Sequence, residues 1–166
     1  MEKKFGIFHT IEELNRAAAA QKKEGDYEAL KGLALENNLT EMDAEDYFEG
    51  DYEPFCTPLD AAIGRLEMEA EELRLRSQLM DWKNMIISFC EDNPKLCEGV
   101  FSPDKNLLTV LAKALKLASK NRITVDSRII KEAGLPESAA QIGMVGKDEL
   151  KKIVEAYYLG GKAGEN

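Results

Sequence analysis

The sequence predicts an all-α protein, with a small N-terminal helical subdomain followed by a long central helix and a C-terminal helical bundle. Apolar residues recur at steps of three and four through most of the 166 residues. Residue types that begin and end helices stand at the edges of these segments. With 44% hydrophobic residues the chain can form a core. We divide it into residues 1–56, an acidic helical subdomain, 57–160, a bundle built on a long helix, and 161–166, a frayed tail.

The N-terminal subdomain is expected to hold three short helices. Thr10 with Glu13 matches a capping box, in which each side chain accepts a hydrogen bond from the other residue's backbone. Asp26 and Thr40 are suitable N-caps for the next two segments. Gly25, Asn37-Asn38 and Gly50 are typical helix ends. Helices are therefore expected over residues 11–24, 27–37 and 41–49.

The central helix is expected to begin at Thr57-Pro58, because proline is favoured in the first helical turn. Apolar residues continue at helical spacing to about residue 91, and Trp82 lies among them as a core residue. The apolar stripe changes phase near residues 74–78, so we expect the buried face to rotate or the helix to bend there. Two stripes on one long helix also leave room for a homodimer.

The C-terminal bundle is expected to contain three further helices and a linker of uncertain form. A short turn after Asn93-Pro94 should end at Gly99, and Ser102-Pro103 should open the next helix, over 103–121. A short extended piece, a helix ended by Gly134 and a final helix are expected over 123–125, 127–133 and 147–159. In the 103–121 helix the residues expected to face inward are Leu107, Leu108, Leu111, Leu115 and Ala118.

Charge is distributed unevenly along the chain, whose net charge is −9. Residues 1–56 hold 6 basic and 14 acidic groups, whereas residues 103–166 hold 11 basic and 8 acidic groups. No Lys or Arg occurs between Lys31 and Arg65. Such asymmetry indicates partners of two kinds, or head-to-tail contact between copies.

The densest acidic stretch, EMDAEDYFEGDYE, is the main candidate for function. It fails as an EF-hand loop, because aromatic residues and a proline occupy positions that need oxygen ligands. Its acids could also act as paired catalytic carboxylates, but that role needs a pocket in which their pKa values differ, and a short exposed helix offers none. Two interpretations of the stretch remain, an ordinary solvated surface and a docking surface for a basic protein. The predicted partner-binding residues are Glu41, Asp43, Glu45, Asp46, Tyr47, Phe48, Glu49, Asp51, Tyr52 and Glu53, with the aromatic side chains as apolar anchors.

A second candidate surface is basic and lies in the C-terminal half. Lys113, Lys116, Lys120 and Arg122 could contact nucleic acid phosphates. The segment lacks the interleaved aromatic residues of a dedicated nucleic-acid surface. The favoured interpretation of these residues is the solvent-exposed side of a bundle helix, so any DNA contact is expected to be weak.

The remaining motifs favour no enzyme. No nucleophile elbow, phosphate loop or zinc-protease motif is found, and no cofactor or metal site is expected. Cys56, Cys90 and Cys97 are an odd number without a C-x-x-C pair, which indicates buried free thiols. No apolar run is long enough to span a membrane, and the first residues do not match a signal peptide. We expect a non-catalytic cytoplasmic protein.

Several segments, taken in order, resemble a known family. They are KKFGIFHTIEELNRAA, EGDYEALKGLALENN, DAEDYFEGD, EAEELRLRSQLMDWKNMI and ELKKIVEAYYLG. Together they are similar to small anti-CRISPR proteins, carried on phage and conjugative elements of gut bacteria, that inhibit the type II-A effector nuclease. The segment from Trp82 to Leu159 is also similar to a second group of conjugation-associated proteins that includes such inhibitors.

The resemblance implies binding to an RNA-guided nuclease and interference with target DNA engagement or cleavage. Such a nuclease holds nucleic acid in a positively charged channel, so an acidic protein could occupy contacts meant for DNA. Long-range attraction would steer the two together. The alternative is a non-catalytic adaptor or regulatory protein of a conjugative element, with or without nucleic-acid binding.

Overall fold

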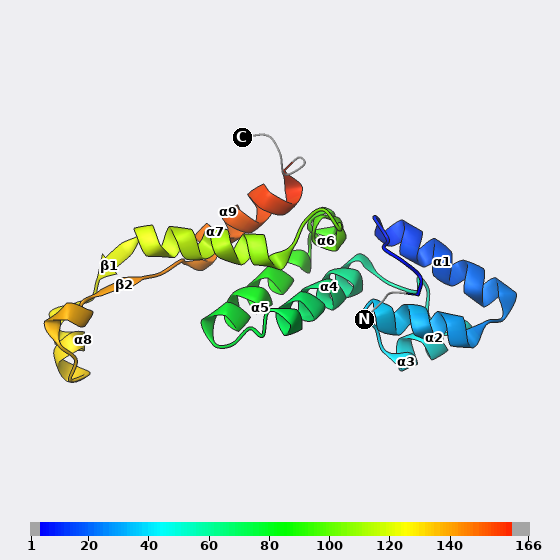
Figure 1. Ribbon diagram of the computed structural model, residues 1–166, viewed down its shortest axis with the longest axis horizontal. Coiled ribbons are helices and arrows are strands. Elements are labelled where there is room, and N and C mark those ends of the chain that lie inside the picture. The colour runs from blue at the N-terminus through cyan, green and yellow to red at the C-terminus, as the bar shows by residue number, and fades with distance from the viewer. Residues whose placement is uncertain (1–3, 161–166) are drawn as a thin grey trace.

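The computed structural model describes residues 4–160 and is mostly helical, which confirms the all-α fold class. Figure 1 shows an elongated molecule, with α1 to α3 at one end and a thin arm that carries α8 at the other. The elements are α1 (Ile11–Glu24), α2 (Tyr27–Glu36), α3 (Glu41–Glu49), α4 (Pro58–Glu72), α5 (Gln78–Cys90), α6 (Pro94–Phe101), α7 (Leu107–Lys120), β1 (Arg122–Thr124), α8 (Ser127–Glu132), the 3-10 turn η1 (Glu137–Ala139), β2 (Gln141–Gly143) and α9 (Lys147–Leu159).

The three N-terminal helices lie within a residue of the predicted bounds, because their end signals are local. Thr10 and Thr40 each form a capping box with the residue three positions on. Gly25 and Gly50 end α1 and α3 in the left-handed conformation, which costs glycine little. We call residues 4–56 the N-terminal module. Its core is centred on Leu14, Leu30, Leu33, Ala44, Tyr47, Phe55 and Cys56.

The prediction of one long helix over residues 58–91 is wrong. The chain reverses between α4 and α5, and the two helices pack against each other (Figure 1). Arg74 and Ser77 adopt positive φ values of 52° and 51°, and the Leu75 amide donates to the Ala70 carbonyl, which closes the end of α4. The phase change in the apolar stripe therefore marks a turn rather than a bend. The buried Lys83 of α5 forms an ion pair with Glu67 of α4 across the hairpin.

The segment after α5 also differs from the prediction at two helix ends. Gly99 lies inside α6, which continues to Phe101, and a Cβ at Gly99 would lie 2.6 Å from the Tyr158 carbonyl oxygen. Glycine is thus used for close packing against α9 and not as a stop. The next helix begins at Leu107 and not at 103, because Asn106 supplies the cap by accepting from the Thr109 amide at 2.8 Å.

The second core joins α4, α5, α6, α7 and α9. Trp82 is buried there as expected, together with Leu66, Ile86 and Leu150. Leu108 and Leu115, predicted to face inward, are more than half exposed, and Val110 and Ala114 take the buried positions beside Leu107, Leu111 and Ala118. The two cores meet along α4, since Ala61 belongs to the first and Ala62 to the second.

Residues 122–144 form an arm that leaves the second core after α7 and returns before α9 (Figure 1). Strands β1 and β2 pair antiparallel, with Ile123 opposite Ile142, and α8 and η1 lie between them. The extended piece expected at 123–125 is thus one strand of a ribbon, and the linker of uncertain form supplies the other.

Two further expectations concern the ends and the membrane. The tail expected at 161–166 lies outside the described residues. Across residues 4–160, no helix has the length and apolar character needed to cross a membrane.

Candidate protein-binding surface

The acidic stretch forms α3 and the turn that follows it, and we call residues 41–53 the acidic surface. The fold of this surface is set by Thr40, whose hydroxyl accepts from the Asp43 amide while its own amide and hydroxyl donate to the Asp43 carboxylate at 2.7 Å. At the other end the amides of Gly50, Asp51 and Tyr52 donate to the Asp46 carbonyl. A short helix is thereby fixed at both ends.

Two opposite faces of α3 carry different residues. With about 100° of rotation per residue, positions spaced by three and four share a face. Ala44 and Tyr47 lie on the buried face. The opposite face carries Met42, Glu45, Asp46 and Glu49. The helix therefore separates its buried apolar residues from its free acids, and Met42, which is 68% exposed, is the apolar residue of α3 that lies among those acids.

The prediction that Tyr47 anchors a partner is wrong, because its side chain belongs to the core. Tyr47 is only 6% exposed, and its ring packs edge-to-face on Phe55 with a centroid distance of 5.3 Å. Burial raises the pKa of its hydroxyl. Phe48 is half-buried against Tyr27, with a centroid distance of 5.4 Å. Tyr52, at 58% exposure, is the aromatic side chain of this surface that a partner can reach.

Lys22 of α1 contacts the C-terminal end of α3. Its ammonium group donates to the Tyr47 carbonyl at 2.6 Å and lies 4.5 Å from the centre of the Tyr47 ring. It also lies 3.9 Å from the Glu53 carboxylate. A cation at this place favours the helix, since the last carbonyls of a helix carry partial negative charge.

The seven acids divide into three that are engaged within the chain and four that are not. Glu41 pairs with Lys31 at 2.5 Å, and the hydrogen bond from Lys31 raises the pKa of that lysine. Glu53 faces Lys22, and Asp43 is used in the capping box. Among residues 4–160 the carboxylates of the other four make no hydrogen bond or ion pair: Glu45, Asp46, Glu49 and Asp51. These four give the surface its available negative charge.

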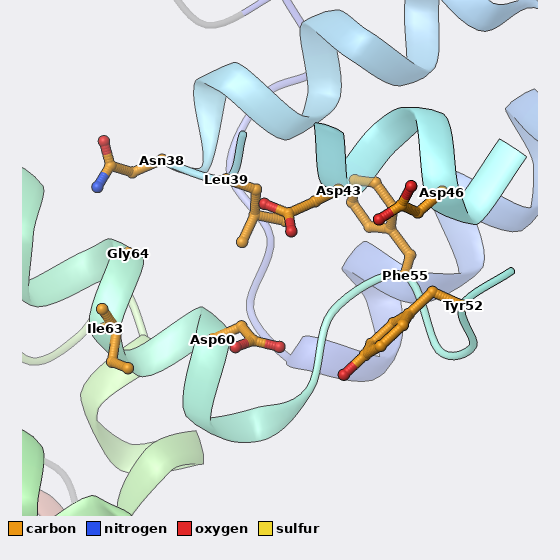
Figure 2. Close-up of a pocket in the computed structure, with 9 residues that line it drawn as sticks. All are labelled: Asn38, Leu39, Asp43, Asp46, Tyr52, Phe55, Asp60, Ile63 and Gly64. Carbon is orange, nitrogen blue, oxygen red and sulfur yellow. The ribbon is translucent and has the colours of Figure 1, made fainter. Parts of the chain in front are cut away.

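A cavity of about 330 Å³ opens beside α3, between it and the start of α4. Figure 2 shows Asp43, Asp46 and Asp60 around one opening, with the Tyr52 ring at one side and Ile63 at the other. Asp43 and Asp60 each accept hydrogen bonds at Oδ2 from the preceding cap threonine. Among the described residues, no hydrogen bond reaches their Oδ1 atoms, so the opening is lined by negative charge and an aromatic ring.

Close backbone packing holds the walls of this cavity in place. A Cβ at Gly64 would lie 2.4 Å from the Asn37 carbonyl oxygen, so only glycine lets α4 approach the end of α2. Asn15 exchanges two hydrogen bonds with the backbone of Cys56, at 2.9 and 2.8 Å, and so ties the segment before α4 to α1. The cavity is built on fixed elements of the N-terminal module and on the start of α4.

The sequence did not indicate Asp60 or Met42 as site residues. In the sequence Asp60 is only an acid in the first turn of a helix, and its place across the cavity from Asp43 depends on how the chain after α3 positions the start of α4. Met42 could have been found, because it precedes Glu45, Asp46 and Glu49 by three, four and seven residues. Within the described chain, no group of three or more His, Cys, Asp or Glu side chains could hold a metal ion.

The second candidate surface is also exposed, and it lies on a different part of the molecule. Lys113, Lys116 and Lys120 share one outer face of α7, and Arg122 begins β1. Exposed Leu108 and Leu115 lie on the neighbouring face of the same helix. No aromatic side chain occurs on α7, so bases would find no stacking partner there.

Comparison with known protein families, with curated proteins and with solved structures finds no match to this chain. The site itself must therefore carry the functional argument.

Proposed function

We propose that this chain is a non-catalytic inhibitor that binds the RNA-guided nuclease of a type II CRISPR system through its acidic surface. The observation that carries the proposal is the set of four unengaged carboxylates, Glu45, Asp46, Glu49 and Asp51, on one short, doubly capped helix and its exit. The resemblance of the chain to anti-CRISPR proteins supplies the choice of partner.

The chemistry of the surface suits a basic protein groove. Type II nucleases hold nucleic acid in a positively charged channel and contact the motif beside the target with arginine side chains. An arginine or lysine of the nuclease that entered the cavity would meet Asp43, Asp46 and Asp60, with the Tyr52 ring beside its charged group. Those nuclease groups would then be withheld from DNA, and inhibition would follow without any chemical step.

Cleavage of a target DNA by the guide-loaded nuclease tests the proposal. We expect inhibition when the chain is added before the DNA, and weaker inhibition when it is added afterwards, since both compete for the same basic groups. Replacing Glu45, Asp46, Glu49 and Asp51 together by lysine should abolish inhibition. Full inhibition by a correctly folded variant of this kind would contradict docking through the acidic surface.

The second candidate function is that of an adaptor or regulatory protein of a conjugative element. The observation that favours it is the separate basic face of α7, which would allow a protein and a nucleic acid to be held together. A pull-down from cells that carry the element, with and without the four lysine substitutions, distinguishes the candidates. Capture of a relaxase or coupling protein, with nuclease activity unaffected, would favour the adaptor.

A further inference from the structure

The arm, residues 122–144, is too small to bury its own large apolar side chains. Ile123, Ile129, Leu135, Ile142 and Met144 are between 41% and 61% exposed. At roughly 200 Å² for a fully exposed side chain of this size, they present on the order of 500 Å² of apolar surface, as much as the largest patch on a typical monomer, which is often functional. A patch of this kind indicates a binding surface.

The geometry of the ribbon concentrates part of this surface on one side. Ile123 and Ile142 are direct cross-strand partners, so their side chains project from the same face. Met144 follows Ile142 by two residues and extends that face along the chain. The other face carries Arg122, Thr124 and Gln141 together with Gly143, whose Cβ would lie 2.3 Å from the Ala118 carbonyl oxygen. That face lies toward the end of α7, and the apolar face is left uncovered.

The arm is also too small to be stable by its own contacts. Its strands have three residues each, and a hydrogen bond from the Val125 amide to the Ala140 carbonyl adds a single further step. A two-stranded ribbon in water is marginal, and a third strand or a covered apolar face is needed for independent stability. Figure 1 shows the arm extending away from the helices of the second core. It presents both edges of its ribbon for pairing.

Charge indicates what covers the arm. The chain has a net charge of −9, so two copies repel each other overall. The arm holds three basic and three acidic residues and is neutral, and it lies at the opposite end of the molecule from the acidic N-terminal module. Arg128 is already engaged, since both of its side-chain hydrogen bonds go to Asp126 within the arm. The apolar faces of two arms can therefore meet without bringing like charges together.

We infer that two copies of this chain associate arm to arm, with the five exposed apolar side chains of each arm, Ile123, Ile129, Leu135, Ile142 and Met144, in the contact. Two arms bring about 1,000 Å² of apolar surface, and homodimer interfaces are about 65% apolar, so the total reaches the standard size of a specific interface, about 1,500 Å². The dimer does not depend on the out-of-phase stripes of residues 58–91, because those stripes are buried within one chain. It leaves both acidic surfaces free at the far ends.

Sedimentation velocity of the full chain over a range of micromolar concentrations tests this inference. We expect a concentration-dependent dimer, and a dimer dissociation constant raised at least tenfold by Ile142→Lys, since a buried lysine would have to lose its water. Ile129→Lys, on the outside of α8 and away from the strands, should also weaken the dimer without disturbing strand pairing. Ile7→Lys is the matched control, because Ile7 is 67% exposed in the N-terminal module, and it should change nothing.

Cross-linking supplies a second measurement. All three native thiols are buried, so a cysteine introduced on the apolar face by Met144→Cys would be the accessible one among the described residues. A short thiol cross-linker should join two copies of this variant, and Glu28→Cys on α2 should stay monomeric. A wild-type chain that is monomeric at every concentration, or a dimer that Ile142→Lys and Ile129→Lys leave intact, would overturn the inference. Neither result bears on inhibition of the nuclease through the acidic surface.

Discussion

The acidic surface and the arm are both exposed, but they are built on opposite physical principles. The acidic surface rests on a packed core, keeps its aromatic residues Tyr47 and Phe48 inside and presents unengaged carboxylates. The arm is neutral, has little core of its own and presents Ile123, Ile142 and other apolar side chains. The difference shows that one chain can present a charged surface and an apolar surface at the same time when the two lie far apart.

The largest effect is expected from removing a core aromatic residue of the acidic surface. Tyr47→Ala should lower the free energy of unfolding by about 3 kcal/mol, because it leaves a cavity beside Phe55 and removes the ring over which Lys22 lies. Tyr52→Ala, at an exposed position, should change it by less than about 0.5 kcal/mol. Urea denaturation measures both, and equal effects would refute the division of this surface into core and exposed aromatics.

The two classes of acid can be separated in the same way. Asp43→Ala should cost about 1 kcal/mol of stability, since it removes one half of the capping box with Thr40. Asp46→Ala should leave stability within about 0.5 kcal/mol and weaken binding to the nuclease instead. Thermal unfolding and a binding assay on both variants check this. The surface would need reinterpretation if Asp46→Ala were the more destabilising change.

The sequence predicted the N-terminal module well because its signals are local. Thr10, Gly25, Thr40 and Gly50 begin and end helices by contacts within four residues of themselves. The turn between α4 and α5 contains neither glycine nor proline, so only the phase change of the apolar stripe marked it. The ribbon depends on pairing between residues about twenty positions apart, which no local pattern specifies.

The candidate site was predicted only in part, for a related reason. Counting acids found the stretch from Glu41 to Glu53, but not which acids are engaged, because Lys22 and Lys31 reach it from α1 and α2. The mixture of acids and aromatics resembled a docking surface, yet Tyr47 alternates with the acids only to face the core. The exposed apolar residues that resemble an interface lie instead in the arm, part of which was predicted only as a linker of uncertain form.

Salt should act on the two surfaces in opposite directions. Raising ionic strength from about 0.01 M to 0.15 M shortens the screening length from about 30 Å to about 8 Å. Binding of the nuclease through Glu45, Asp46, Glu49 and Asp51 should then weaken severalfold, mainly through slower association. The arm-to-arm dimer should hold or tighten, because repulsion between two chains of charge −9 is screened. Sedimentation and binding kinetics in one salt series would show whether the responses diverge, and parallel responses would contradict the comparison.

The smallest effect is expected on DNA. Lys113, Lys116, Lys120 and Arg122 lack stacking partners, so duplex DNA should bind no better than non-specifically, with a dissociation constant of roughly 10⁻⁴ to 10⁻⁶ M at physiological salt. Replacing the three lysines by serine should reduce even this and lower the salt slope of the gel shift. Tight binding that survives the replacement would place the nucleic-acid surface elsewhere.

The most direct test of the central claim is the affinity of the chain for the guide-loaded nuclease, measured for two variants of equal charge. One variant carries lysine in place of Glu45, Asp46, Glu49 and Asp51. The other carries lysine in place of four exposed acids near the ends of α4 and α5, Glu71, Glu72, Glu91 and Asp92. Docking through the acidic surface predicts that the first loses at least a hundredfold in affinity and the second only severalfold, since close charge pairs outweigh net charge. Equal losses would show that the nuclease responds to overall charge and that the acidic surface is no docking site.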